Sequence, residues 1–218
     1  MKCLVERRGG QAWVYACDIT DAASTDLLVK HLLSDHEGID MLVNNAGRSI
    51  RRGVMLSYGR FHDFERTMAI NYFGAVRLVL ALLPHMVERR FGHIVNVSSI
   101  GVQANPPRFS AYVASKAALD AFSRIVATET YGDGVTFTTI HMPLVRTPMI
   151  SPTRLYDAFP TSSPERAAEM VVDALIERPK QINTAAARGQ SARESTADGS
   201  PLSRTADALV RLLPGVHW

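Results

Sequence analysis

The chain has 218 residues, of which 46% are hydrophobic, and its formal net charge is +3. This length is enough for one sizeable hydrophobic core and short for two ordinary domains, so we expect a single domain. The small excess of basic residues is scattered along the chain, which argues against nucleic-acid binding.

The sequence lacks the motifs of metal-binding, disulfide-rich, membrane-spanning and secreted proteins. Cys3 and Cys17 have neither zinc-site spacing nor the pattern of a disulfide framework, so we expect a cytoplasmic protein. The histidines lack the spacing of metal ligands, and we expect no metal site. No apolar run approaches the length of a membrane span, and the first ten residues lack the apolar core of a signal peptide.

The predicted elements alternate between buried strands and amphipathic helices. We expect strands at Ala12 to Ala16, Ile39 to Val43, His93 to Val97 and Val135 to His141, separated by helices at Asp21 to His36, Phe61 to Arg90 and Ala111 to Tyr131. A last helix is expected at Pro164 to Glu177, with Ser163 as its cap. This order predicts the α/β class: a Rossmann-like, doubly wound parallel sheet with right-handed crossovers and helices on both faces.

The end of the chain differs in composition. From Gln181 to Thr205 it is rich in Ala, Arg, Ser, Thr and Gly and has hardly any apolar residue. We therefore expect a folded domain over residues 1–180 and a disordered tail over residues 181–218, with a short terminal helix at Ala206 to Leu213.

Four polar clusters directly follow the predicted strands: Asp18, Asn44 to Gly47, Ser98-Ser99, and Met142 to Met149. In open parallel sheets the ligand site lies outside the carboxyl ends of the strands. The sequence therefore predicts one site at which these four segments meet.

The strongest chemical pattern is Tyr112-Val113-Ala114-Ser115-Lys116, with Ser99 thirteen positions before Tyr112. Side chains four apart on a helix share a face, so we expect the Lys116 ammonium beside the Tyr112 phenol. A nearby cation lowers the pKa of a phenol and makes it a usable general acid at neutral pH. An isolated pair of this kind would usually be an ordinary exposed pair, and Ser99 is what favours the catalytic interpretation.

These residues resemble the catalytic element of the classical short-chain dehydrogenases/reductases, and the resemblance runs from about Gly9 to Arg178. It implies hydride transfer between a nicotinamide cofactor and a carbonyl or carbinol carbon, with Tyr112 giving or taking the proton of the oxygen. Lys116 would lower the pKa of Tyr112 and bind the nicotinamide ribose, while Ser99 would orient the carbonyl. Asn71 matches the helix asparagine that maintains a proton relay to the lysine.

The same resemblance implies a set of cofactor contacts. Asn44-Asn45-Ala46-Gly47 matches the turn beside the cofactor, and Asp18 matches the aspartate that contacts adenine. The implied cofactor-binding residues are Asp18, Ile19, Asn45, Ala46, Gly47, Tyr112, Lys116, Val145 and Thr147. NADP is the expected cofactor, with NAD as the second choice, and the two long helices are expected to form a homo-oligomer. Taken alone, Asp18 would be a turn or capping residue and Asn71 a packing residue.

Two further segments narrow the resemblance. Gly101 to Phe109 and Met142 to Met149 look like the reductase domain of bacterial fatty acyl-CoA reductases, which implies a long-chain acyl-CoA or fatty aldehyde substrate. Met and Pro stand at 142 and 143, where the family usually has Pro-Gly. The apolar residues Met149, Ile150, Leu155, Tyr156 and Phe159 would either cover an acyl chain or simply pack on the core, and the sequence favours neither.

The sequence departs from the family at its start. No glycine-rich turn follows a strand anywhere in the chain, and Gly9-Gly10 precedes the first predicted strand. We therefore expect the first strand, glycine loop and helix of the fold to be missing, with Met1 already inside the helix. Two functional classes stay open: an oxidoreductase, or a noncatalytic fragment that serves as an oligomerisation or binding partner. A serine hydrolase built on Ser99 and Lys116 would need a nucleophile elbow that the sequence lacks.

Overall fold

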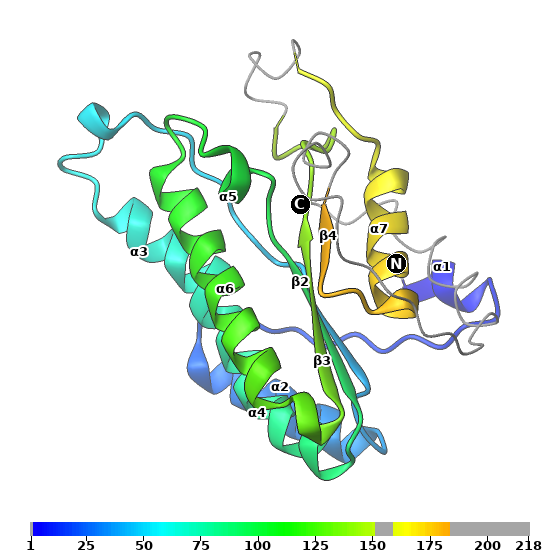
Figure 1. The fold of residues 1–218 in the computed structure, drawn as a ribbon. Helices are drawn as coiled ribbons and strands as arrows, with labels where there is room; N and C mark the ends of the chain where they lie inside the picture. The colour runs from blue at the N-terminus through cyan, green and yellow to red at the C-terminus, as the bar shows by residue number, and fades with distance from the viewer. Residues whose placement is uncertain (1, 151–158, 184–218) are drawn as a thin grey trace.

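The computed structural model describes residues 2–150 and 159–183 (Figure 1). Its helical elements are α1 (Lys2–Glu6), α2 (Ala22–Asp35), η1 (Val54–Leu56), α3 (His62–Met68), η2 (Ala69–Phe73), α4 (Gly74–Glu88), α5 (Gly101–Ala104), α6 (Ser110–Glu129), η3 (Tyr131–Asp133) and α7 (Pro164–Glu177). Its strands are β1 (Met41–Asn44), β2 (Gly92–Val97), β3 (Val135–His141) and β4 (Gln181–Asn183).

The four strands form one parallel sheet in the order β1-β2-β3-β4. Met41 pairs with His93, and Gly92 pairs with Val135, so the strands are aligned from their first residues. Every residue of β2 is buried, which is typical of a strand covered on both faces. The predicted α/β class and parallel sheet are confirmed.

Helices cover the two faces of the sheet through two separate apolar clusters (Figure 1). On one face, Ile94 and Phe137 pack with residues of α4 such as Val79 and Leu82. On the other face, Val95 and Ile140 pack with residues of α7. Because neighbouring residues of a strand point to opposite faces, β2 and β3 contribute to both clusters.

The last connection of the sheet departs from the predicted handedness. The connections β2-α6-β3 and β3-α7-β4 both advance in the same direction across the sheet, but α6 and α7 lie on opposite faces. The two connections therefore have opposite hands. The expectation of right-handed crossovers throughout was wrong for one of them, because α7 has its own apolar face and covers the side that α4 and α6 leave open.

Most helix boundaries agree with the sequence because their caps are local. Asp21 accepts a hydrogen bond from the Ser24 amide at the start of α2, and Ser163 accepts one from the Arg166 amide at the start of α7. Such side-chain caps stabilise a helix by about 1 kcal/mol. The predicted helix Pro164 to Glu177 has the bounds of α7.

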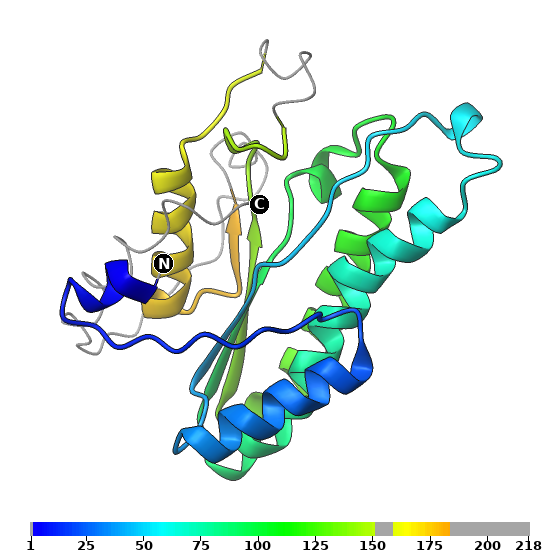
Figure 2. The ribbon, with the colours of Figure 1, turned by 180° about the vertical axis from the view of Figure 1, so that it is seen from behind.

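The predicted strand Ala12 to Ala16 was wrong. The segment is extended but pairs with no strand in the described part of the chain (Figure 2). It crosses instead to the end of α2, where the Tyr15 hydroxyl donates to Asp35 and the Trp13 ring meets His36 edge-on. A strand exists only through hydrogen bonds to a partner, and no described strand lies beside β1 on its outer edge.

A short helix opens the described part of the chain. Helix α1 comes first, and Gly9 follows it with a φ of +83°, in the left-handed region that glycine favours. No strand precedes β1, and no glycine-rich turn leads from a strand into a helix within residues 2–150 and 159–183.

Two boundaries differ from the predicted ones. Residues 181–183, expected in the disordered tail, form β4 beside β3, and the Thr139 amide donates to Lys180 O at the start of this pairing. The expected terminal helix lies outside the described residues. The predicted helix Phe61 to Arg90 is a continuous helical segment, His62–Glu88, with a π turn at Ala69–Phe73.

That same segment, His62–Glu88, is long and apolar enough by composition to cross a membrane. In the structure, however, Val79, Leu82 and Met86 of α4 are at most 1% exposed and pack against the sheet. Burial in the core accounts for these residues, but only 33% of the apolar stretch is buried.

Candidate active site

The carboxyl ends of β1, β2 and β3 bring three of the four predicted polar segments to one edge of the sheet. The Asn44 side-chain amide donates to Asn96 Oδ1 at 2.8 Å, which links the ends of β1 and β2. The Ile100 amide donates to Met142 O at 2.9 Å, which links the segments after β2 and β3. The fourth segment, at Asp18, follows no strand.

Lys116 lies at the centre of this edge. It comes from α6, is only 4% exposed, and its Nζ donates to Val97 O at the end of β2 at 2.6 Å. Burial lowers the pKa of Lys116 to about 8, and the Asp120 carboxylate opposes that shift. The ammonium is therefore held against the sheet beside the site.

Tyr112 and Ser99 are the two other predicted catalytic residues near Lys116 in the sequence or the fold. Tyr112 is on the same helix, and Ser99 follows the strand that binds the Lys116 ammonium. Tyr112 lies one turn before Lys116 on α6, is half-buried, and its ring packs edge-on against Phe109. Ser99 follows β2, and its hydroxyl accepts the Gly101 amide at 3.0 Å. A Cβ added to Gly101 would lie 3.2 Å from Ser99 Oγ and 3.4 Å from Val113, so Ser99 and the first turn of α6 both lie against this glycine.

Asn71 sits in the π turn that interrupts the long helix, and it is 1% exposed. Its side chain accepts the Arg48 amide at 2.8 Å and donates to both Arg48 O and Ser115 Oγ at 2.9 Å. A π turn places one extra residue in a helix and is frequent at functional sites. Here it is the element whose asparagine joins the loop after β1 to α6.

Gly47 brings Asn71 and Lys116 together. A Cβ at Gly47 would lie 3.1 Å from Asn71 Oδ1 and 3.4 Å from Lys116 Nζ, so both side chains lie against this glycine. Three of the residues predicted from distant motifs thus share one spot.

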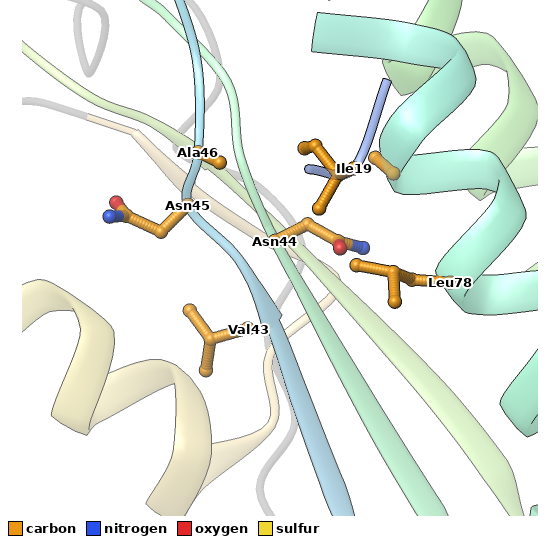
Figure 3. Close-up of a pocket in the computed structure, with 7 residues that line it drawn as sticks. Ile19, Val43, Asn44, Asn45, Ala46 and Leu78 are labelled. Carbon is orange, nitrogen blue, oxygen red and sulfur yellow. The ribbon is translucent and has the colours of Figure 1, made fainter. Parts of the chain in front are cut away.

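A small cavity lies beside this cluster, at the outer edge of β1 (Figure 3). Figure 3 shows Asn44 pointing toward Ile19 and Leu78, whereas Asn45 and Val43 point to the other side of the strand. The cavity is lined by Ile19, Val43, Asn44, Asn45, Ala46, Ala75 and Leu78. It therefore includes three predicted cofactor residues: Ile19, Asn45 and Ala46.

The segment around Ile19 reaches the cavity because of a glycine. A Cβ at Gly74 would lie 2.9 Å from Ile19 O and closer still to the Ile19 side chain, so α4 and this segment are in direct contact. Arg77 adds hydrogen bonds to the carbonyls of Ile19 and Thr20. Asp18 is exposed and forms the turn, accepting from the amide and hydroxyl of Thr20, and these hydrogen bonds lower its pKa.

Val145 and Thr147 lie after β3, beside the core cluster under α7. Val145 forms a parallel bridge with Ser162 and packs against this cluster, and Thr147 is half-buried. Of the apolar residues expected near a substrate, Leu155 and Tyr156 lie outside the described residues, and Phe159 is 54% exposed.

Two buried histidines occupy the strands, as the sequence indicates. Burial, together with the Arg178 charge, lowers the pKa of His93 to about 4, so this side chain is neutral. His141 lies between Asp120 Oδ2 and Asn183 Oδ1, each at 2.8 Å from one ring nitrogen. The Asp120–His141 pair was not predicted, because no short motif joins a helix to a strand 21 residues later.

The residues present fit a nicotinamide dinucleotide at one end. Asn45 Oδ1 is buried and has no hydrogen-bond partner among the described residues, so it is free to accept from a ligand. Gly47 leaves space that a Cβ would fill next to Lys116. No glycine-rich turn at a helix start is present in the described ranges to receive a pyrophosphate.

Comparison with known proteins agrees with this geometry. Residues 2–156 match the family model described as short chain dehydrogenase. The chain belongs to the short-chain dehydrogenase family. The family is one of oxidoreductases, and membership supports a nicotinamide dinucleotide cofactor.

Relatives within this family narrow the comparison. The chain is 49% identical to a fatty acyl-CoA reductase of Acinetobacter baylyi, over all of this chain and 82% of that protein. It is also 49% identical to a fatty acyl-CoA reductase of Mycobacterium tuberculosis, over 80% of this chain and 60% of that protein.

Solved structures of the short-chain dehydrogenase family share the fold. A short-chain dehydrogenase from Streptomyces avermitilis superposes with a TM-score of 0.72 at 30% identity, covering 83% of this chain and 73% of that one. A metagenomic short-chain oxidoreductase in complex with NADP gives a TM-score of 0.61 at 26% identity, over 66% of this chain and 63% of that one.

Proposed function

We propose that this short-chain dehydrogenase reduces the carbonyl of a long-chain fatty acyl-CoA or fatty aldehyde, with NADPH as the preferred donor. The observation that carries the catalytic part is the buried Lys116 ammonium, held by Val97 O and lying against Gly47 together with Asn71. The 49% identity to a fatty acyl-CoA reductase along the whole chain supports the substrate class.

The proposed roles are those that the family resemblance implies, and the positions of Lys116 and Asn71 support them. When bound, the reduced dinucleotide supplies the hydride that the carbonyl carbon accepts. Tyr112 donates its phenolic proton to the carbonyl oxygen, and Ser99 holds that oxygen with its hydroxyl. Lys116, one helical turn from Tyr112, favours the ionised phenol left after this transfer. With an acyl-CoA, the hemithioacetal formed in this way breaks its C–S bond, and the hydroxyl proton leaves with sulfur as the CoA thiol, which gives the aldehyde.

Asn71 is proposed to keep the proton path to Lys116 in place. Its amide is fixed by three hydrogen bonds, to the Arg48 backbone and to Ser115, so its orientation is set before any ligand binds. Asn45, Ala46 and Ile19 would contact the dinucleotide through the cavity at the edge of β1.

The choice of NADPH has separate support. The related metagenomic oxidoreductase was solved with NADP, and the Arg77 guanidinium lies at the site, where it donates to the carbonyls of Ile19 and Thr20. A cytoplasmic location also suits a chain whose two cysteines are unpaired.

A second function is favoured by one observation. In the described residues, no strand is followed by a glycine-rich turn that would receive the pyrophosphate of a dinucleotide. A noncatalytic chain that binds other copies through its long helices would have this property and would not need the cofactor.

Titration with NADPH and NADH separates the two functions. A ligand that binds only the native state must raise its thermal stability, so the oxidoreductase is expected to show saturable stabilisation and quenched or enhanced nucleotide fluorescence. An unchanged melting temperature up to about millimolar nucleotide would instead favour the noncatalytic chain.

Tyr112→Phe tests the proton donor. The variant keeps the ring and loses only the hydroxyl, so we expect the melting temperature to change little while fatty aldehyde reduction falls by about 100-fold or more. NADPH binding, followed by the same fluorescence, should survive in this variant. Turnover at the wild-type rate would show that another group protonates the substrate.

A further inference from the structure

An exposed apolar turn lies between β1 and α3, outside the site described above. In the η1 turn, Val54 is 61% exposed, and Met55 and Leu56 are each 70% exposed. Tyr58 and Phe61 follow, at 77% and 71%. Figures 1 and 2 both show this segment projecting from the body of the molecule, at the end of the sheet where the candidate active site lies.

The sequence on either side of this turn is rich in arginine. Residues 48–66 contain five arginines, Arg48, Arg51, Arg52, Arg60 and Arg66, against two carboxylates. The net charge of these 19 residues is therefore +3, as large as that of the whole chain.

One of the two carboxylates is buried and shared by several cations. Asp63 is 2% exposed and binds Arg52 at 3.0 Å, Arg60 at 3.1 Å and Arg66 at 2.5 Å. Burial would raise the pKa of Asp63, but these arginines lower it to about 2. A single carboxylate thus anchors three guanidinium groups, which stay between one third and one half exposed at the base of the turn.

We propose that this segment, residues 48–66, docks on a lipid bilayer that carries anionic headgroups. The apolar tip enters the interface, and the arginines around its base bind the phosphate and carboxylate groups of the lipids. The inference rests on the surface alone and does not depend on the substrate proposed above.

The shape of the tip favours a fluid partner. In a 3₁₀ turn, successive side chains point about 120° apart, so Val54, Met55 and Leu56 face three different directions. A flat protein surface would contact only one of these three side chains, whereas the acyl chains of a bilayer can contact all three.

The charge argues against a second copy of the chain as the occupant. A two-fold interface centred on this segment would bring the arginines of one copy against the same arginines of the other. An anionic bilayer instead complements the charge and the apolar tip at once.

The docked orientation has a functional consequence. The same loop begins at Arg48, whose amide and carbonyl bind Asn71 in the candidate active site. The tip and the site are therefore joined by a few residues, and a docked chain has its site near the membrane surface, where long-chain compounds accumulate.

The test is flotation of the purified full chain with vesicles of phosphatidylcholine alone and of phosphatidylcholine mixed with phosphatidylglycerol. We expect binding to the mixed vesicles only, weakened when the ionic strength is raised from about 0.05 to about 0.5 M because the charges become screened. Equal binding to both vesicle types, or no binding to either, would overturn the proposal.

Variants locate the contact. The double variant Met55→Asp and Leu56→Asp removes two exposed apolar side chains and should reduce vesicle binding by about tenfold or more. Arg51→Glu, which alters an exposed arginine that binds none of the carboxylates described, should reduce it by about fivefold or more. A matched control on α2, at the opposite end of the molecule, is Leu27→Asp with Lys30→Glu, which should bind as the wild type does.

Two measurements distinguish membrane docking from misfolding and from self-association. Circular dichroism and the melting temperature should change little in the tip variants, since these side chains are exposed and the bond from the Tyr58 hydroxyl to Met55 Sδ is itself exposed. Sedimentation without vesicles should be identical for wild type and tip variants. A loss of self-association in the tip variants would mean that a second copy covers the turn, and the lipid proposal would fail.

Discussion

Lys116 combines a full positive charge with nearly complete burial. Burial lowers its pKa to about 8 from the ordinary value of 10.5, and Asp120 only partly opposes this. The group is held by its bond to Val97 O and its contact with Gly47, so the folded chain keeps a costly charge at the site. Such a charge is the kind of feature that functional sites retain.

This shift predicts how stability depends on pH. Between pH 8 and 10.5 the unfolded chain holds the Lys116 proton and the folded chain has released it, so the free energy of unfolding rises with pH across this window. The contribution of this one group is about 3 kcal/mol. Urea unfolding of wild type and Lys116→Met at pH 8 and pH 10 measures it, because the variant should lack this component. Parallel pH profiles for the two proteins would contradict the assignment.

A substitution at Gly47 should affect turnover much more than it affects stability. A Cβ there would lie 3.1 Å from Asn71 Oδ1, which would have to move by a few tenths of an ångström, and would touch Lys116 Nζ at 3.4 Å. Gly47→Ala should therefore lower turnover by about tenfold or more while the melting temperature changes by a few degrees at most. Gly53→Ala is the control, since a Cβ there has nothing within 4 Å. Equal loss of turnover in both variants would remove the special role of Gly47.

The spacing of residues along the chain predicts which candidate residues share a helix face, but not the hydrogen bonds they make to distant segments. Helical periodicity brings Tyr112 and Lys116 onto one face, because both lie on the same helix. The hydrogen bond from Asn71 to Ser115 joins residues 44 positions apart and depends on a π turn that no periodicity indicates. The three arginines on Asp63 were missed for the same reason, since their convergence is a property of the folded loop.

At the scale of elements, local signals decided which predictions were confirmed. Helix α7 begins after its Ser163 cap and ends at its predicted residue, because caps act within one turn. The segment 12–16 has the composition of a strand but no partner, and β4 has a partner but only three residues of unremarkable sequence. Whether a segment forms a strand depends on a hydrogen-bonded partner strand, which the composition of the segment does not reveal. This accounts for the wrong prediction at residues 12–16 and for the missed strand β4.

The turn between α6 and β3 gives a prediction at this scale. Gly134 has a φ of +75°, and a Cβ there would clash with Arg90 O. Gly134→Ala should therefore lower the free energy of unfolding by more than about 2 kcal/mol, from backbone strain and the displaced contact together. Gly132→Ala, two residues earlier, has nothing within 4 Å of its Cβ and should change it by less than about 0.5 kcal/mol. Similar denaturation midpoints for the two variants would refute the structural difference between them.

At the scale of the whole molecule, the long helices keep an apolar surface that the described chain does not cover. Ile125 on α6 is 59% exposed, and Leu80 on α4 is 55% exposed. Helix α6 packs against α3 and η2, and α4 packs against η2. We propose that copies of the chain associate through the exposed apolar side chains of these long helices.

Ile125→Lys tests that association. A lysine buried between two copies costs several kcal/mol, so the variant should sediment as a single chain of 23.9 kDa while the wild type sediments as a larger species. Leu27→Lys on α2 is the control and should keep the wild-type mass, because α2 lies outside the proposed interface. A wild type that is itself a single chain would overturn the proposal.

The change of face at the last connection has a consequence for the order of synthesis. When β3 has left the ribosome, Ile94 and Phe137 already have α4 and α6 to pack on, whereas Val95 and Ile140 await α7. Helix α7 starts at Pro164, which a ribosome reaches about 1 to 5 seconds after the end of β3. For that interval the apolar side chains on this face of the sheet lack their covering helix, and apolar surface exposed during synthesis favours aggregation.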